Sequence, residues 1–362
     1  MIKHINPWPD LFITIPVLLL VILGTLVIYS SDPQLAYQQV IFILIGLFFY
    51  WFISFIDLEV YNSYVNLLYI AVILLLVIVF VIGIETRGSA RWITFLGFQF
   101  QPSELAKPII ILSLSKFWSQ RVPSWQNIFK SFLLMLPIVG LVLKQPDLGT
   151  ALTLIAIWIS IFIATNVAIV KLIVMSLAGL VFTPVAWNFL KDYQKDRILS
   201  FISPARDPLG IGYNAIQSTI AVGSGELFGR GLGRGTQSRL RFLPEFRTDF
   251  VFASIAEEFG FIGAMIVLSL YGLIIGRSLK IASNAGSRFN VMIVFGVLGM
   301  LFFQIIVNIG MNIGIVPITG ITLPLLSYGG SSLVTILLSL GFIASVARFS
   351  QREYFVSSQA LD

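Results

Sequence analysis

The chain has 362 residues, of which 57% are hydrophobic and 11% are charged, and its formal net charge at pH 7 is +6. Soluble proteins are about 45–50% apolar and about 25% charged, so this composition excludes a soluble globular protein, a disordered chain and a fibrous repeat. The chain has no Cys and one His, His4, which excludes disulfides, thiolate nucleophiles, His-based triads and His or Cys metal clusters. Its chemistry must therefore use carboxylates, Lys, Arg, hydroxyl groups and backbone.

Apolar runs of about 20 residues, the length needed to cross a bilayer, recur along the chain. Ten such spans are expected, at residues 11–30, 37–56, 62–84, 103–120, 127–143, 147–164, 168–190, 249–276, 289–315 and 323–347. The first span lacks a small-residue cleavage site and is too long for a signal peptide. We therefore expect an all-α polytopic membrane protein with about ten transmembrane helices. It would form one integral-membrane domain, residues 1–362, with a large extracytoplasmic loop, 191–248, between helices 7 and 8.

Basic residues in the short loops predict the orientation, because Lys and Arg are more frequent on the cytoplasmic side. With a cytoplasmic N-terminus, ten basic residues of short loops and tails lie inside, and three (Arg87, Arg91 and Lys144) lie outside. The long loop adds nine basic residues outside, but it is close to the length at which this rule loses force. Ten spans then place both termini in the cytoplasm.

Three acids begin spans on the same outer face of the membrane: Glu104, Asp147 and Asp249. Acids are favourable at the positive end of a helix dipole, and Pro102 and Pro146 suit the start of a helix. Helix initiation alone would explain Glu104 or Asp147. It does not explain why three carboxylates share a face with the longest polar loop, so we interpret all three as candidate site residues.

Lys107 lies one turn beyond Glu104, inside the apolar slab of the fourth span. A lysine at this depth is costly and is a functional candidate by default. Its alternative role is to pair with Glu104 at the i,i+3 spacing. The sequence supports both interpretations equally.

The segment Arg87-Gly88-Ser89-Ala90-Arg91-Trp92-Ile93 precedes the fourth span on the outer face. Trp92 could stack on a sugar while Arg91 binds its phosphate. An interfacial aromatic anchor would explain the tryptophan equally well.

The long loop concentrates charge, because residues 191–249 hold 15 of the 40 charged side chains and eight of the 29 glycines. The run 223–235, Gly-Ser-Gly-Glu-Leu-Phe-Gly-Arg-Gly-Leu-Gly-Arg-Gly, cannot form a stable helix, and its backbone amides could hold an anion. Arg230, Arg234 and Arg241 favour a phosphate-bearing ligand, for which a lipid-linked pyrophosphate suits the membrane better than ATP. The alternative is a solvated, charged surface loop.

Asp249 lies at the end of this loop, at the water boundary, and is the candidate general base. Glu257 and Glu258 lie roughly 12–13 Å deeper on the same helix and point in other directions, so they do not pair with it. Ordinary glycoside hydrolysis takes two carboxylates, one of which protonates a poor leaving group. Pyrophosphate needs no proton to leave, so one base with Arg and Lys suits glycosyl transfer from a lipid pyrophosphate. Mg²⁺ or Mn²⁺ would be compatible with this chemistry, although the sequence identifies no metal ligands, and we expect no organic cofactor.

A segment rich in Gly, Pro, Ser and Thr, residues 317–332, precedes the last expected span. Gly and Pro at membrane depth are typical of a broken helix that lines a cavity. We therefore include Ser327 among the candidate substrate-binding residues. Packing of small residues between helices is the alternative.

Taken together, these motifs resemble the SEDS family (shape, elongation, division and sporulation). The stretches that carry the resemblance are residues 88–93, 101–107, 145–150, 207–213, 235–238, 248–250 with 256–258, and 324–332. They occur in family order over nearly the whole chain. The short N-terminal tail and the stretch Gly235-Thr236-Gln237-Ser238 favour the elongation (RodA) type over the division (FtsW) type, which stays open as an alternative.

The resemblance implies a peptidoglycan glycosyltransferase that polymerises lipid II with inversion, releasing undecaprenyl pyrophosphate. Partners implied are lipid II, the growing glycan chain and a class B penicillin-binding protein; no nucleic acid is expected. The essential aspartate of the family corresponds to Asp249, its Trp to Trp92, and its membrane Glu and Lys to Glu104 and Lys107. This chain has Arg247 where members often have His before the Thr–Asp pair.

Two other classes of function remain open at this point. A flippase or transporter of the same lipid-linked precursor could use Lys107, Glu257 and Glu258 as its pathway. However, the polar residues gather on one face, whereas alternating access needs contacts near the midplane. A scaffold that only recruits a penicillin-binding protein would have no use for the intramembrane charges.

Overall fold

The computed structural model describes residues 9–359 apart from 87, 88, 96, 97, 205, 206, 208, 209, 211 and 241. Its helices are α1 (Leu11–Ser31), α2 (Pro33–Ser54), α3 (Leu58–Ile82), α4 (Pro102–Ser119), α5 (Trp125–Lys144), α6 (Leu148–Ala164), α7 (Ile169–Phe189), α8 (Asp192–Ile202), α9 (Tyr213–Ser224), α10 (Thr236–Arg239), α11 (Val251–Ser283), α12 (Arg288–Asn312) and α13 (Gly330–Gln359). Three short strands, β1 (Ile84–Thr86), β2 (Ser89–Phe95) and β3 (Phe98–Phe100), lie between α3 and α4.

Ten of these helices, α1 to α7 and α11 to α13, correspond to the ten predicted spans, with the largest differences in bounds at α13 and at the end of α11. Among the described residues, seven helices are long and apolar enough to cross a membrane by length and composition alone. Of the other three, α6 and the apolar part of α7, Ile169–Val185, are shorter, and α4 carries Glu104, Lys107 and Lys116. The predicted fold class, a helical polytopic membrane protein, is confirmed.

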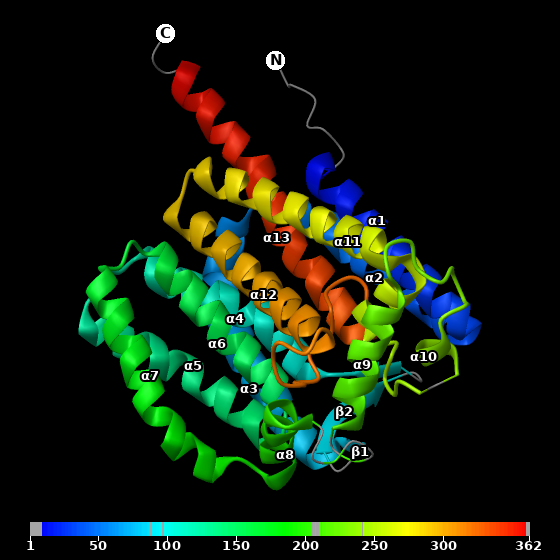
Figure 1. Cartoon of the computed structure of the whole chain (residues 1–362). Coiled ribbons are helices and arrows are strands. Elements are labelled where there is room, and N and C mark those ends of the chain that lie inside the picture. The colour runs from blue at the N-terminus through cyan, green and yellow to red at the C-terminus, as the bar shows by residue number, and fades with distance from the viewer. Residues whose placement is uncertain are drawn as a thin grey trace.

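Local sequence accounts for where the helices begin. Asp10, Asp32, Asp57 and Asp147 are N-caps whose carboxylates accept backbone N–H bonds at the starts of α1, α2, α3 and α6. These caps satisfy amides that otherwise have no partner within the helix. In Figure 1, α1 begins and α13 ends at one end of the bundle, while α8 and the strands lie at the opposite end. The loop residues and the helix starts that line the site belong to that opposite end.

The small sheet was not predicted. The strands pair in the order β1-β2-β3, all antiparallel, and Trp92 on β2 is the register partner of Ile84. The segment Ser89–Phe95 contains Trp, Ile, Thr and Phe, which favour extended backbone. The sheet places Arg91 and Trp92 beside the start of α4.

The segment 191–248 contains α8, α9 and α10 and a glycine-rich turn region, 225–235. As predicted, the glycine run is not helical, apart from Gly223 and Ser224 at the end of α9. The extracytoplasmic position of this segment and the single-domain organisation of the chain stay predictions.

The glycine-rich region packs against a break in α11 at Gly260, where φ is +68°. The Phe261 amide donates to the Glu226 carbonyl at 2.8 Å, and the Arg230 amide donates to the Glu257 carbonyl at 2.9 Å. A methyl group on Gly260 would lie 2.3 Å from the Gly229 nitrogen, so glycine is required here. This contact joins the long segment to the transmembrane bundle.

Candidate functional site

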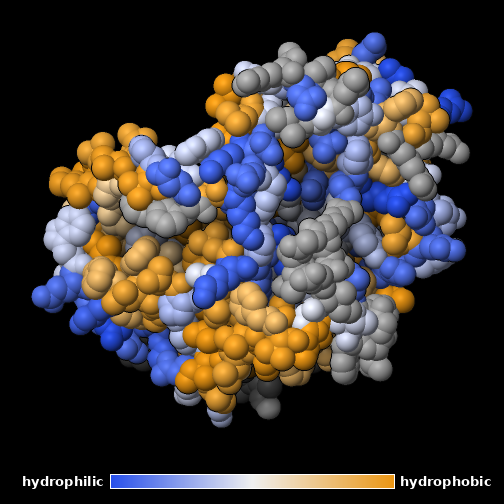
Figure 2. All heavy atoms as spheres, turned by 90° about the horizontal axis from the view of Figure 1, so that it is seen from below, coloured by the Kyte–Doolittle hydropathy of each residue, from blue (hydrophilic) through white to orange (hydrophobic). Residues whose placement is uncertain are grey.

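A polar cavity of about 710 Å³ lies at the end of the bundle opposite to the start of α1 and the end of α13. Its lining comes from β2, α4, α6, α8, α12, the turn before α11 and the segment before α13. Figure 2, which views this end, shows hydrophilic residues across the middle of the face and hydrophobic residues over much of its outer part. The charged residues of the lining are Arg91, Glu104, Lys107, Asp147, Lys191, Arg197, Glu245 and Asp249.

The structure brings six of the ten predicted site residues together in this cavity. These six are Arg91, Trp92, Glu104, Lys107, Asp147 and Asp249. Arg230, Arg234 and Ser327 do not line it, and Arg241 lies outside the described residues. Substrate contact by any of them stays a prediction.

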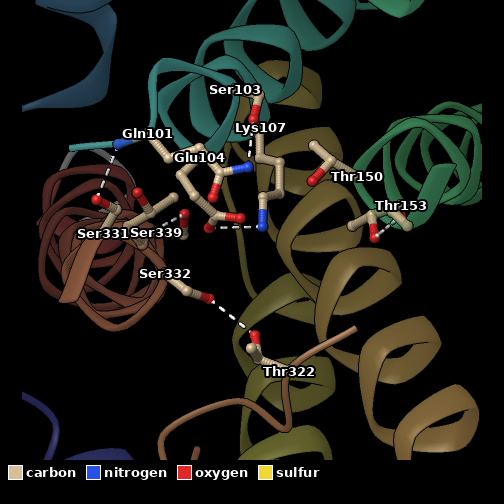
Figure 3. A network of polar contacts seen from close by, with 12 residues as sticks. Gln101, Ser103, Glu104, Lys107, Thr150, Thr153, Thr322, Ser331, Ser332 and Ser339 are labelled. Carbon is tan, nitrogen blue, oxygen red and sulfur yellow. Dashed lines mark hydrogen bonds and ion pairs between the residues drawn. The ribbon is translucent and has the colours of Figure 1, made fainter. Parts of the chain in front are cut away.

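Glu104 and Lys107 form an ion pair in the first turns of α4. The Nζ of Lys107 lies 2.7 Å from the Oε2 of Glu104, and both side chains are buried. Figure 3 shows the pair among side chains of α4, α6 and α13 that point toward one another. Both residues also line the cavity, so the i,i+3 pairing is confirmed, and their functional role stays a prediction.

Asp147 begins α6 and also links it to α4. Its carboxylate accepts bonds from the Thr150 amide at 3.1 Å and from the Thr150 hydroxyl at 2.9 Å. The side-chain amide of Gln101 donates to Oδ2 of Asp147 at 2.8 Å, the same oxygen that accepts from the Thr150 hydroxyl. Asp147 is therefore an N-cap, as its position predicted, and also a cross-link at the cavity wall.

Two hydrogen-bond donors of Arg91 bond to backbone carbonyls. Its Nε donates to the carbonyl of Gln145 at 2.7 Å, and its Nη2 donates to the carbonyl of Pro146. Tyr193 of α8 donates its hydroxyl to the same Pro146 carbonyl at 3.0 Å. These bonds fix β2 and α8 to the turn before α6, with Trp92 next to Arg91 on the cavity wall.

Asp249 is positioned through its backbone by α12. The side-chain amides of Asn308 and Asn312 donate to its carbonyl oxygen at 2.9 and 3.1 Å. Asn308 also donates to the Ile321 carbonyl at 2.7 Å, and Asn312 accepts from the Ala253 amide at 3.0 Å. The two asparagines thus tie the turn that carries Asp249 to the segment before α13. Sequence reasoning missed them, although two amides four residues apart in an apolar span were a usable signal.

Ser327 acts on the backbone next to Asp249. Its hydroxyl donates to the Thr248 carbonyl at 2.5 Å and accepts from the Leu323 amide at 2.8 Å. The neighbouring Tyr328 amide donates to the Arg247 carbonyl at 2.8 Å. Because Ser327 is buried and already bonded in this way, its hydroxyl holds the turn that carries Asp249.

Residues 317–329 are not a helix but a segment that enters the cavity wall before α13 begins at Gly330. The predicted start of the last span, residue 323, is therefore too early, although the expectation that this segment lines a cavity agrees with the structure. The phenol of Tyr328 also lines the cavity. Burial, with a smaller effect of Asp32, raises its pKa, so it stays neutral at ordinary pH and does not compete as a base.

Arg247, which stands where the family often has His, points to α1 and α2 rather than to the cavity. Its Nη1 lies 3.2 Å from the Oδ2 of Asp32, and its Nε donates to the hydroxyl of Ser31 at 3.3 Å. Its guanidinium also lies 4.8 Å from the ring centroid of Phe246. This arginine therefore anchors the turn beside Asp249 to the N-terminal helices.

The glycine-rich region binds internal carboxylates. The Gly233 amide donates to Glu258 at 3.1 Å, and the Gln237 amide donates to Glu257 at 2.8 Å. Both glutamates are buried in α11 and do not line the cavity. The free amides expected to hold a phosphate are thus partly used within the chain, and the pathway proposed for a transporter, Lys107 with Glu257 and Glu258, is not one continuous lining.

Four further lining residues were not singled out from the sequence: Lys191, Tyr193, Arg197 and Gln304. The first three belong to α8 and its N-cap, in a stretch that sequence analysis treated only as part of a charged loop. Gln304 is a buried amide of α12 that lines the cavity. Among the described residues, no group of three or more His, Cys, Asp or Glu side chains could hold a metal ion.

Comparisons with known proteins agree with this architecture. The profile of the FTSW_RODA_SPOVE family, described as "Cell cycle protein", matches residues 10–352. Peptidoglycan glycosyltransferase MrdB of Escherichia coli K12 is 38% identical over 351 residues, which covers 95% of this chain and 93% of that protein. Stage V sporulation protein E of Bacillus subtilis is 35% identical over 360 residues, covering 95% and 98%.

Two solved structures resemble the whole bundle. One, described as "Structural coordination of polymerization and crosslinking by a peptidoglycan synthase complex", has a TM-score of 0.83 and 35% identity and covers 94% of this chain and 98% of its own. The other, rod shape determining protein RodA of Thermus thermophilus, has a TM-score of 0.71 and 31% identity and covers 94% and 97%. The likeness therefore extends over nearly the full length of each chain.

Proposed function

The chain belongs to the FTSW_RODA_SPOVE family of cell cycle proteins, and we propose from this membership that it is a RodA-type peptidoglycan glycosyltransferase. It is a multi-pass protein of the bacterial cytoplasmic membrane. Its reaction is the polymerisation of lipid II into glycan strands for cell-wall elongation. The observation that carries this proposal is the carboxylate of Asp249 on the wall of a polar cavity at one end of the bundle.

In the proposed step, Asp249 takes the proton of the 4-hydroxyl of the acceptor sugar. The acceptor oxygen forms a bond to the anomeric carbon of the donor as the bond from that carbon to pyrophosphate breaks. The electron pair leaves with the pyrophosphate, and the anomeric configuration inverts. The anchors at Asn308 and Asn312 hold the base in place for this transfer.

The other cavity carboxylates support a single base. Glu104 is paired with Lys107, Asp147 accepts bonds from Gln101 and Thr150, and Glu245 accepts a bond from the Thr248 hydroxyl at 3.1 Å. A pyrophosphate leaving group needs cationic stabilisation and no proton, so no second acid is required at the reaction centre. We assign Lys107, Arg91 and Trp92 to contacts with the substrate.

A divalent cation in this cavity would have to be coordinated by the protein and the substrate together. The described part of the chain has no three-ligand metal cluster, but Mg²⁺ commonly binds one or two carboxylates together with substrate phosphates. Glu245, a carboxylate of the lining, would hold Mg²⁺ or Mn²⁺ together with the substrate phosphates and leave Asp249 to act as the base. Such an ion would neutralise charge on the pyrophosphate.

The partners and the orientation are proposed on the same basis. We propose that lipid II and the growing glycan chain occupy the cavity and that a class B penicillin-binding protein binds the chain and cross-links its product. Cytoplasmic termini would place the cavity on the outer face, where the glycan is needed. Labelling of single cysteines added near residue 9 and in α8 would test this orientation.

The test is polymerisation of purified lipid II in detergent, with and without the partner. Asp249→Asn should abolish glycan synthesis and leave the protein folded and membrane-inserted, and Asp192→Asn, an exposed acid outside the cavity, is the matched control. Glycan made by Asp249→Asn at the wild-type rate would refute the mechanism. Transport is impossible in detergent, so a wild-type complex that binds lipid II but makes no glycan would favour the flippase alternative.

A further inference from the structure

Helix α8 supplies two cations to the cavity, Lys191 at its N-cap and Arg197 two turns later. Within the part of the chain that the structure describes, neither forms an ion pair with an acid. Arg197 instead lies with its guanidinium 5.9 Å from the ring centroid of Tyr193, which is also in the lining. The helix thus presents positive charge to the cavity and provides an aromatic ring beside it.

The other two cations of the lining already have partners within the chain. Lys107 is paired with Glu104, and Arg91 donates to the carbonyls of Gln145 and Pro146. The arginines expected from the sequence to bind phosphate are also not available in the cavity, since neither Arg230 nor Arg234 lines it. The cationic groups best placed for an anionic ligand are therefore those of α8.

Gly320 shows how close Arg197 comes to the general base. A methyl group on Gly320 would lie 3.5 Å from the Nη1 of Arg197 and 3.6 Å from the Oδ2 of Asp249. The two charged groups are therefore separated by no more than the sum of these distances. Gly320 has a φ of +75° and no side chain, so no side chain at this position stands beside the two charged groups.

An inverting displacement needs both a base and a cation in one site. The attacking oxygen lies next to the base, and the leaving oxygen lies on the opposite side of the anomeric carbon. Arg197 is a cation of the same cavity close to Asp249, so it is available to the leaving pyrophosphate. A guanidinium binds phosphate oxygens through two parallel N–H bonds, and such donors lower the barrier where negative charge develops.

We propose that Arg197, with Lys191 beside it, forms the pyrophosphate subsite for the lipid-linked donor. This inference rests on the proposed glycosyl transfer. In the reaction, the bond between the anomeric carbon and the pyrophosphate oxygen breaks and its electron pair stays on the pyrophosphate, which Arg197 binds. The proton of the acceptor hydroxyl goes to Asp249.

Direct binding of undecaprenyl pyrophosphate to the purified full-length protein tests the subsite without requiring catalysis. Arg197→Gln should weaken this binding at least tenfold and slow lipid II polymerisation, and Arg197→Lys, which keeps the charge but loses the paired donors, should lie between it and wild type. Asp249→Asn should bind undecaprenyl pyrophosphate as wild type does while making no glycan. Lys195→Gln, on the same helix but outside the lining, is the control.

Wild-type affinity in Arg197→Gln would overturn the subsite, even if polymerisation were slow. In that case a changed pH profile of polymerisation would show that the arginine acts only on Asp249. Failure of the proposed function looks different, because the wild-type protein would then bind undecaprenyl pyrophosphate but form no glycan with its partner present. If thermal melting shows that Arg197→Gln is unfolded, Arg197→Lys replaces it in the test. A reduced affinity of Arg197→Lys for undecaprenyl pyrophosphate would then support the subsite, and wild-type affinity would overturn it.

Discussion

Replacing Lys107 by Met tests whether its buried pair with Glu104 only stabilises α4 or also serves the reaction. Lys107 is 1% exposed and Glu104 is 7% exposed, with 2.7 Å between their charged atoms. Removing one partner of such a pair leaves an uncompensated buried charge and costs about 3–5 kcal/mol. We therefore expect Lys107→Met to lower both stability and activity.

The double variant Glu104→Gln with Lys107→Met separates the two effects. Replacing a buried ion pair by uncharged groups of similar volume is often neutral or stabilising, so the double variant should regain at least about 2 kcal/mol over the single variant. Both side chains line the cavity, so the lost charges are not restored where the substrate binds. We expect polymerisation to stay at least tenfold below wild type.

Thermal unfolding in detergent and lipid II polymerisation, measured on the same preparations, give the two readouts. Lys116→Met is the control, because Lys116 lies on the same helix outside the cavity and donates to the Asn62 carbonyl. A double variant with wild-type stability and wild-type activity would show that the pair is purely structural. That result would remove Glu104 and Lys107 from the site.

Four further predictions follow from individual contacts. Replacing Asn308 or Asn312 by Leu should slow polymerisation about tenfold, because each removes one of two donors to the Asp249 carbonyl and leaves the Ile321 carbonyl or the Ala253 amide unpaired, at a cost of about 1–3 kcal/mol. The double variant removes both donors and should lose more than the two singles combined. Gly320→Ala should slow polymerisation without unfolding the bundle, since it adds about 1–2 kcal/mol of left-handed strain and a methyl group beside Asp249; unchanged rates would contradict this. Gly260→Ala should lower the melting temperature and expose the glycine-rich region to proteolysis, because its methyl group meets the backbone of that region. The raised pKa of Tyr328 means that the folded state favours the neutral phenol, so stability should hold below pH of about 10 and fall above it, and Tyr328→Phe should reduce this alkaline loss in melting curves.

The transmembrane helices were predictable because two strong signals coincide in the sequence. Apolar length marks the spans, and residues such as Asp32, Asp57 and Asp147 mark their starts as N-caps. The clustering of Glu104 and Asp147 was predictable for the same reason, since helices that start on one face bring their first turns to one level. The distances between those turns were not predictable, because they depend on how the helices pack side by side.

The residues that position Asp249 were harder to predict from one sequence. Asn308 and Asn312 act through side-chain bonds to a backbone carbonyl 59 and 63 residues away in the chain. Nothing local in α12 indicates that partner. The sheet was missed for a related reason, because its strands of three to seven residues are too short to show a clear alternation. The role of α8 was missed because its basic residues resemble a solvated face until the helix is placed over the cavity.

The acids of this chain differ in how the structure uses them, and the difference supports the proposal that Asp249 is the base. Glu257, Glu258 and Asp147 are buried, and their carboxylates accept bonds from backbone amides, so these side chains join segments of the chain. The turn of Asp249 is held through the backbone, since two side-chain amides of α12 donate to the Asp249 carbonyl oxygen. A base that gains and loses a proton in every cycle benefits from such anchors, because bonds to its backbone do not depend on the charge of its side chain. The glycine-rich region bonds to the glutamates of α11, the helix that begins just after Asp249, and so holds the helix start in place.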